Sequence, residues 1–146
     1  MSKMLRKVGI ALIAGLAVLG SNVVAPAAQA APIIKLWGKW TAVLSGNTGC
    51  GITSMYVTFS LNNLGTGPAT RTMHSTGCAD STTVDTMTIF TLDNTGQGTA
   101  GLTCGAGCGW SLRIQVSSDY DQIIMTDVDP ANPNNTPTGI AIRQFP

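Results

Sequence analysis

After residue 38 the chain consists almost entirely of short stretches in which apolar and polar residues alternate. Such alternation is typical of β-strands that have one face in a core and the other in water. Residues 109–116 show it clearly, with Trp110, Leu112 and Ile114 on one face and Arg113 on the other. Eight strands are predicted in this way, at residues 39–45, 53–61, 69–75, 84–92, 98–104, 109–116, 122–128 and 139–143.

Turn-forming residues separate these stretches, which favours a meander of antiparallel hairpins. The sequence Asp93-Asn94-Thr95-Gly96 is a strong hairpin signal because Asn and Gly accept positive φ. Eight strands joined in this order can close into a barrel, which removes both exposed edges of the sheet. We therefore predict an all-β fold, an eight-stranded antiparallel up-and-down barrel, with a β-sandwich as the alternative.

The N-terminus has the features of a secretory signal peptide. Lys3, Arg6 and Lys7 precede an uncharged apolar run at residues 8–20, and Ala28-Gln29-Ala30 matches a signal-peptidase site. The run is 13 residues long, whereas a membrane-spanning helix needs about 20. We expect cleavage after residue 30, no stable membrane insertion afterwards, and a single secreted or periplasmic domain at residues 31–146.

The charge of the expected mature chain argues against nucleic-acid binding. Residues 31–146 contain five Lys or Arg, seven Asp and no Glu, which gives a net charge of −2. A basic surface of the kind that binds nucleic acid is therefore absent. The polar residues are instead mainly Thr, Ser, Asn and Gly, and Thr favours strands through its branched β-carbon.

The four cysteines predict two disulfides, because the chain is small and expected to be exported. Four cysteines allow three pairings. Cys104 and Cys108 flank a glycine-containing turn, so a bridge across that hairpin is natural and leaves Cys50 to pair with Cys78. A zinc site fits less well, since no second ligand cluster accompanies the C-x3-C spacing.

A meander places alternate connections at the same end of the barrel. The connections that follow the first, third, fifth and seventh strands carry Cys50, Cys78, Cys104 and Cys108. All four cysteines should therefore lie on one rim. The opposite end should carry the short turns, the start of the first strand and the end of the last.

Three short motifs fall at that opposite end. They are Gly38-Lys39-Trp40, Ser118-Asp119-Tyr120 and Arg143. Their order and placement resemble the lipocalins and the wider calycin group. The resemblance implies that Arg143 packs over Trp40 and closes the floor of the barrel. A guanidinium over an indole face gains about 1 to 2 kcal/mol when it is partly desolvated.

The chain departs from the lipocalin pattern, and two other barrel groups are similar. Ser118 replaces the usual Thr, and nothing after Arg143 can form the helix that packs outside lipocalin barrels. The start of the first strand also resembles avidins, but Ala42 stands where avidins place a polar biotin contact, so biotin binding is not expected. The chain is also similar in size to calycin-type inhibitors of secreted metalloproteases, in which an N-terminal segment enters the protease. This resemblance implies that residues 31–36 could act as that segment here.

The sequence offers little support for catalysis or for a metal or other cofactor. His74 is the sole histidine, and strand alternation points Ser75 to the opposite face. Asp119 and Asp121 would lie at the other end of a strand from Asp127 and its neighbour Asp129, about 20 Å away, so they cannot share one ion. We therefore expect no enzyme activity, no metal and no cofactor.

The preferred functional hypothesis is a lipocalin-like binding protein that takes a small apolar or amphipathic ligand at the barrel mouth. An eight-stranded barrel is either filled by its side chains or holds one small ligand. The expected lining residues are Leu44, Val57, Phe59, Leu112, Ile114 and Ile140. The alternative is an extracellular protein-binding module, such as a protease inhibitor.

Overall fold

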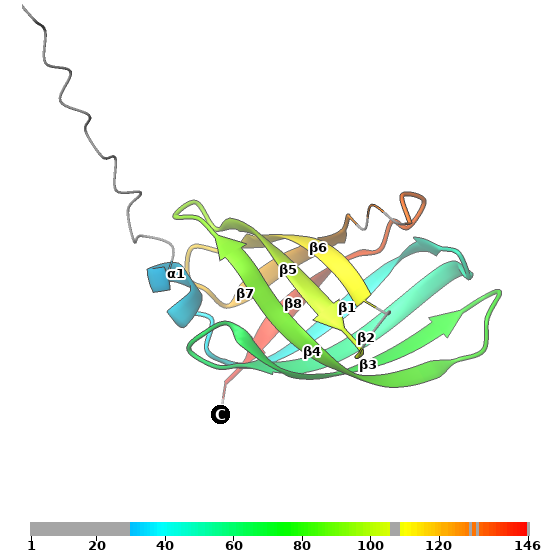
Figure 1. Ribbon diagram of the computed structural model, residues 1–146, viewed down its shortest axis with the longest axis horizontal. Helices are drawn as coiled ribbons and strands as arrows, with labels where there is room; N and C mark the ends of the chain where they lie inside the picture. The colour runs from blue at the N-terminus through cyan, green and yellow to red at the C-terminus, as the bar shows by residue number, and fades with distance from the viewer. Residues whose placement is uncertain (1–29, 106–108, 129, 131, 146) are drawn as a thin grey trace, which may run out of the picture.

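The protein forms a closed β-barrel in the computed structural model, which describes residues 30–105, 109–128, 130 and 132–145. Figure 1 shows the barrel with a short helix at one end. The predicted signal peptide lies, except for Ala30, outside these residues. The elements are α1 (Ala30–Ile34), β1 (Gly38–Thr48), β2 (Gly51–Leu61), β3 (Thr66–Ser75), β4 (Ser81–Leu92), β5 (Gln97–Thr103), β6 (Gly109–Val116), β7 (Gln122–Asp127) and β8 (Thr138–Gln144).

Each strand pairs with its neighbour in sequence, and β1 also pairs with β8. Trp40 on β1 lies opposite Phe59 on β2 on one side and opposite Arg143 on β8 on the other. All pairs are antiparallel, so the predicted eight-stranded meander barrel is confirmed for the described part of the chain and the sandwich alternative is wrong.

Several strands are longer than predicted at one end of the barrel. β1 continues to Thr48 and β2 begins at Gly51, so a two-residue turn joins them. Apolar alternation stops at Leu44 because the next inward-facing side chain, Thr48, is polar. Its hydroxyl lies 2.8 Å from that of Thr53, and this buried pair replaces the apolar contact that the pattern requires.

The two ends of the barrel differ in construction. We call the end that carries the β1–β2, β3–β4, β5–β6 and β7–β8 connections the mouth. The other end, which we call the floor, carries α1, the turns β2–β3, β4–β5 and β6–β7, and the end of β8 (Figure 1). This arrangement confirms the predicted distribution of connections between the two ends.

The floor is closed by α1 and by the residues that follow it. Leu36 is fully buried, and Ile33 packs against the core beneath the β2–β3 turn. Residues 31–36 were expected to play the part of a segment that enters a protease. In the structure residues 31–34 belong to α1, and Leu36 forms part of the core. We call the buried Leu36 the plug of the floor. Because it lies outside the strands, the alternating pattern of strand residues could not predict it.

The indole of Trp40 is a central part of the core. It is fully buried and stacks on Phe59, with ring centres 6.1 Å apart and planes within 5°. Its Nε1 donates a hydrogen bond of 2.9 Å to the Leu36 carbonyl oxygen. The indole therefore joins the floor segment to the barrel wall.

We predict that Trp40→Ala lowers the free energy of unfolding by about 3 to 5 kcal/mol, because it leaves a large cavity and frees the Leu36 carbonyl. Chemical denaturation followed by circular dichroism measures this value. Trp37→Ala is the matched control, since Trp37 is exposed and its removal should change stability by less than about 0.5 kcal/mol. Equal losses in the two variants would contradict the placement of Trp40.

Candidate functional site

The Arg143 guanidinium covers the Trp40 indole at the floor of the barrel. Its central carbon lies 5.1 Å from the ring centre. One Nη2 hydrogen bond reaches the carbonyl oxygen of Lys35, which belongs to the segment between α1 and β1. The packing that the lipocalin resemblance implied for Arg143 and Trp40 is therefore present in this chain.

The β6–β7 turn joins the same cluster. Tyr120 adopts a φ of 62°, and its amide donates a 3.0 Å hydrogen bond to the Ser117 carbonyl. The Lys35 ammonium lies 4.7 Å from the centre of the Tyr120 ring. A hydrogen bond from the Ser117 hydroxyl lowers the pKa of the exposed Asp119 below its ordinary value. The turn thus binds the floor segment through Tyr120, while Asp119 stabilises the turn itself.

Gly38 supplies a backbone conformation at the entry to β1. Its φ is 137°, a value that residues with a side chain rarely adopt. A Cβ atom at this position would meet no atom within 4 Å, so backbone conformation and not space requires the glycine. The bend lets the chain pass from the floor segment into the barrel wall.

Five of the six predicted lining residues face the interior and are buried: Leu44, Val57, Phe59, Leu112 and Ile114. Ile140 is a wrong prediction, since it is 38% exposed on the outer surface, whereas Ala141 is fully buried inside. β8 carries the sequence Ile140-Ala141-Ile142, in which the larger apolar residues point outward. Assigning the more hydrophobic residues of this strand to the interior therefore gives the wrong inward face.

Within the described residues, side chains fill the interior of the barrel. A void of about 10 Å³ lies among Leu44, Met55, Val57, Met87, Leu102, Trp110, Leu112 and Met125. That volume is at the lower limit of what one water molecule occupies. Phe59 and Ile114 do not line it. A preformed chamber for a lipid-sized ligand is therefore not present among these residues.

A buried ion pair lies inside the barrel near the mouth. Arg71 Nε donates a 2.8 Å hydrogen bond to Asp85 Oδ2, and both side chains are buried. The Arg71 guanidinium lies 5.8 Å from the Trp110 ring centre. The sequence analysis missed this pair because charged residues are usually exposed. Strand parity would have found it, since Arg71 shares the inward face of β3 with Ala69.

The mouth is tied by a disulfide and by loop contacts. Cys50 and Cys78 are bonded, which confirms the predicted pairing. The second predicted bridge, Cys104 to Cys108, cannot be described because Cys108 lies outside the described residues. The β7–β8 loop packs closely on β1, because a Cβ at Gly46 would lie 2.5 Å from the Thr136 carbonyl oxygen.

The described titratable groups form no catalytic constellation. His74 Nδ1 lies 2.8 Å from Asp80 Oδ2, but both side chains are exposed near the mouth. Ser75 has its hydroxyl buried on the inward side of β3, away from His74, as strand alternation predicts. Within the described residues no three His, Cys, Asp or Glu side chains are placed to bind a metal ion.

The outer surface carries an uncharged apolar row that the sequence analysis did not identify. The register aligns Ile124 on β7, Ile140 on β8, Val43 on β1 and Tyr56 on β2. All four side chains are exposed. Ile140 was predicted to line the interior and the other three residues carried no predicted role, because only the pairing between strands brings the four together. We call these four residues the apolar row.

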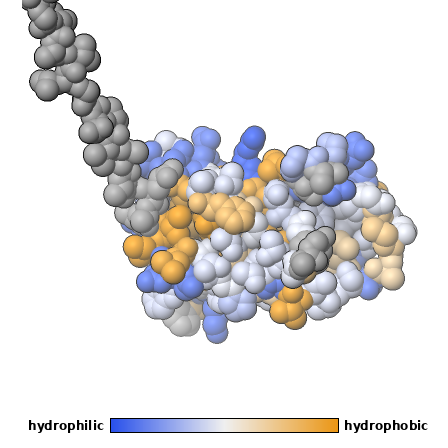
Figure 2. All heavy atoms as spheres, viewed as in Figure 1, coloured by the Kyte–Doolittle hydropathy of each residue, from blue (hydrophilic) through white to orange (hydrophobic). Residues whose placement is uncertain are grey.

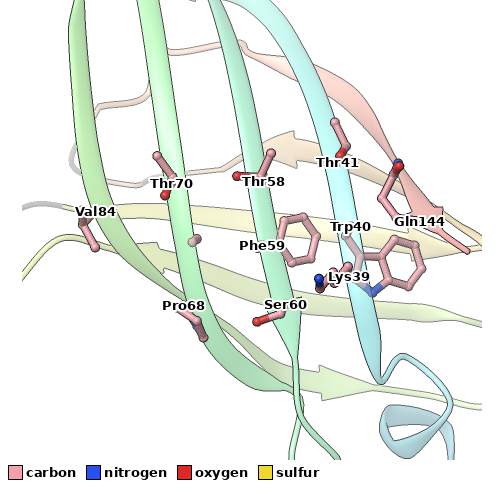
Figure 3. Close-up of a pocket in the computed structure, with 11 residues that line it drawn as sticks. Lys39, Trp40, Thr41, Thr58, Phe59, Ser60, Pro68, Thr70, Val84 and Gln144 are labelled. Carbon is pink, nitrogen blue, oxygen red and sulfur yellow. The ribbon is translucent and has the colours of Figure 1, made fainter. Parts of the chain in front are cut away.

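Shallow depressions surround the start of β1. One, of about 370 Å³, crosses the outer wall of β1, β2 and β3, where the hydroxyls of Thr41, Thr58 and Thr70 lie in neighbouring positions (Figure 3). A second, of about 530 Å³, lies between Trp37 and Phe145 at the floor. Neither was expected from the sequence, because each is formed by residues on different strands or beyond the strand ends.

Comparison with protein-family models and with curated protein sequences finds no match. Within the described residues, no helix has the length and apolar character that crossing a membrane requires. Inference about the function therefore rests on the geometry of this chain.

We predict that Trp40 and Arg143 are energetically coupled. In a double-mutant cycle of Trp40→Ala and Arg143→Ala, the coupling free energy should be about 1 to 2 kcal/mol, because the cation–π contact exists only when both side chains are present. Urea denaturation of the four proteins measures it. Arg113→Ala, on the outer wall of β6, is the control and should be additive with Trp40→Ala. Additivity of Arg143→Ala as well would contradict the contact.

Proposed function

We propose that this chain is an exported, lipocalin-like barrel that works as a protein-binding module. The observation that supports this proposal best is the contrast between a filled interior and an outer wall that exposes the apolar row. A partner that contacts the wall needs no internal chamber. Such a role requires no catalytic group, metal or cofactor, and we expect none.

The surroundings of the apolar row suit a protein interface. On the same strands the adjoining outward positions are mainly hydroxyl-bearing, including Thr41, Ser45 and Thr58. Interface cores are depleted of charge and enriched in aromatic residues, with a polar rim around them. Tyr56 at one end of the row and the surrounding hydroxyls match this composition. A contiguous exposed apolar patch is also a common mark of an interaction site.

Export is part of the proposal. The bonded Cys50–Cys78 pair suits an oxidising compartment, and the N-terminal sequence has the composition of a signal peptide. We infer a secreted or periplasmic location. The partner is then an extracellular or periplasmic protein, and a protease is one candidate class.

The inhibitor mechanism considered for residues 31–36 needs revision. In the calycin-type inhibitors a leading segment enters the protease, but here Leu36 is buried and the Lys35 carbonyl accepts a hydrogen bond from Arg143. Deleting this segment would therefore disturb the fold as well as any contact with a partner. The apolar row is the better inhibitory surface to test.

We predict that Val43→Ser with Tyr56→Ser abolishes partner binding, because it removes two of the four side chains of the apolar row without altering the core. The protein would be immobilised, exposed to proteins of the surrounding medium and assayed against secreted metalloproteases. Val84→Ser is the matched control, since Val84 is exposed on β4 outside the row. Binding or inhibition lost equally in the control, or kept in the double variant, would contradict the proposal.

A small apolar or amphipathic ligand at the mouth is the second candidate function. The observation that favours it is the lining of the void, in which Met55, Met87 and Met125 surround the space beside Trp110. Methionine side chains are flexible and readily repack around a guest. The Arg71–Asp85 pair nearby would give a polar end to an otherwise apolar site.

This candidate predicts that the protein retains a molecule after incubation with a lipid extract, as native mass spectrometry would detect. Met87→Phe should reduce retention because it overfills the void, at a stability cost of about 1 to 3 kcal/mol. Ile140→Ser, on the outer wall, should leave retention unchanged. If the wild-type protein retains nothing, the candidate is excluded and protein binding stands alone.

A further inference from the structure

Four large apolar side chains are exposed at the floor of the barrel. Ile34, Trp37, Leu64 and Phe145 are exposed by 54%, 69%, 73% and 71%, and each belongs to a different local segment. They lie on α1, before β1, in the β2–β3 turn and after β8. Figure 2 shows apolar residues gathered at the end of the molecule where Figure 1 places α1. The proposed protein-binding function uses none of these side chains.

These four residues form one arc on the floor. The depression between Trp37 and Phe145 joins the start of β1 to the end of β8, which are paired strands. Another depression extends from Trp37 to the β2–β3 turn that carries Leu64. Ile33, which precedes Ile34, packs beneath that turn. The four side chains therefore lie around one end of the barrel, at α1, the β2–β3 turn, the start of β1 and the end of β8.

Charge is distributed unevenly around the arc. Lys35 and Lys39 are exposed beside Ile34 and Trp37. The aspartates of the floor, Asp93, Asp119 and Asp121, lie in the β4–β5 and β6–β7 turns. Cleavage after residue 30 would add a positively charged amine at the start of α1. Lys35 and Lys39 thus lie beside the apolar arc, and Lys35 also contacts the Tyr120 ring in the β6–β7 turn that carries Asp119 and Asp121.

We propose that this floor arc is a membrane-surface contact, with the bilayer interface as its partner. Exposed Trp and Phe beside Lys are the residues that settle at a lipid interface, where the rings enter the headgroup region and the ammonium groups stay in water. Before cleavage, the leader would also hold this end of the chain at the export membrane. Its apolar run ends at Gly20, ten residues before α1, a distance of at most about 35 Å. An uncleaved chain would therefore present this end to the membrane.

The contact differs from membrane insertion. Within the described residues no helix is suited to crossing a bilayer, and the arc comprises four side chains on segments that adjoin the strands of a closed barrel. We therefore expect reversible binding in the plane of the interface, independent of the apolar row on the barrel wall. The mature protein would lie with its floor on the membrane and its mouth toward the surrounding medium.

The test uses the chain that begins at Ala31, which keeps all eight described strands, with vesicles of phosphatidylcholine alone or mixed with phosphatidylglycerol. We expect flotation with the mixed vesicles and a blue shift of tryptophan emission from Trp37, which is exposed while Trp40 is buried. Trp37→Ser with Phe145→Ser should abolish both signals. Each Lys→Gln change at Lys35 or Lys39 should weaken binding about fivefold.

Val84→Ser is the matched control, because Val84 is equally exposed but lies on the barrel wall. It should bind vesicles as the wild type does, and thermal unfolding should show that all variants remain folded. The proposal is overturned if the wild type binds neither vesicle, or if Val84→Ser weakens binding as much as the floor variant. It is also overturned if sedimentation shows a dimer that Trp37→Ser converts to a monomer, since a second copy would then cover the arc.

Discussion

The pairing of β1 with β8 is the constraint on which the rest of the structure depends. Because this register sets Trp40 opposite Arg143, the guanidinium reaches both the indole face and the floor segment. The same indole donates to the Leu36 carbonyl. Closure of the sheet, burial of the floor segment and placement of the arginine are therefore one cooperative arrangement. Without the β1–β8 pairing, the edges of both strands would be exposed.

Closure also determines what the interior can contain. Eight strands enclose a space that side chains can fill, and here large residues do so, with Trp40 and Phe59 stacked in the core and methionines nearer the mouth. A family resemblance based on floor motifs carries no information about this volume. The exposed apolar side chains that strand pairing aligns, the apolar row, lie on the outside of the barrel.

The barrel and its floor could be predicted from the sequence because both depend on local signals. Alternation and turn residues locate the strands, and the meander order places Cys50 and Cys78 on one rim. Ile140 was assigned to the wrong face of its strand. Residues 140–142 (Ile-Ala-Ile) alternate in size as a strand does, but the two larger side chains point outward and the alanine points inward. The apolar row depends on cross-strand register, which a single sequence does not display, and Leu36 lies outside the alternating strands. Strand parity already points Arg71 inward, but its partner Asp85 becomes clear only in the structure.

The two ends of the barrel are closed in different ways. At the floor, Leu36 is buried in the core and the exposed arc around Trp37 lies outside it. At the mouth, the Cys50–Cys78 bond joins two connections, and the buried Thr48 and Asp85 give the interior polar groups near that end. The floor is therefore held by packing against the core, whereas a covalent bond and buried polar pairs hold the mouth.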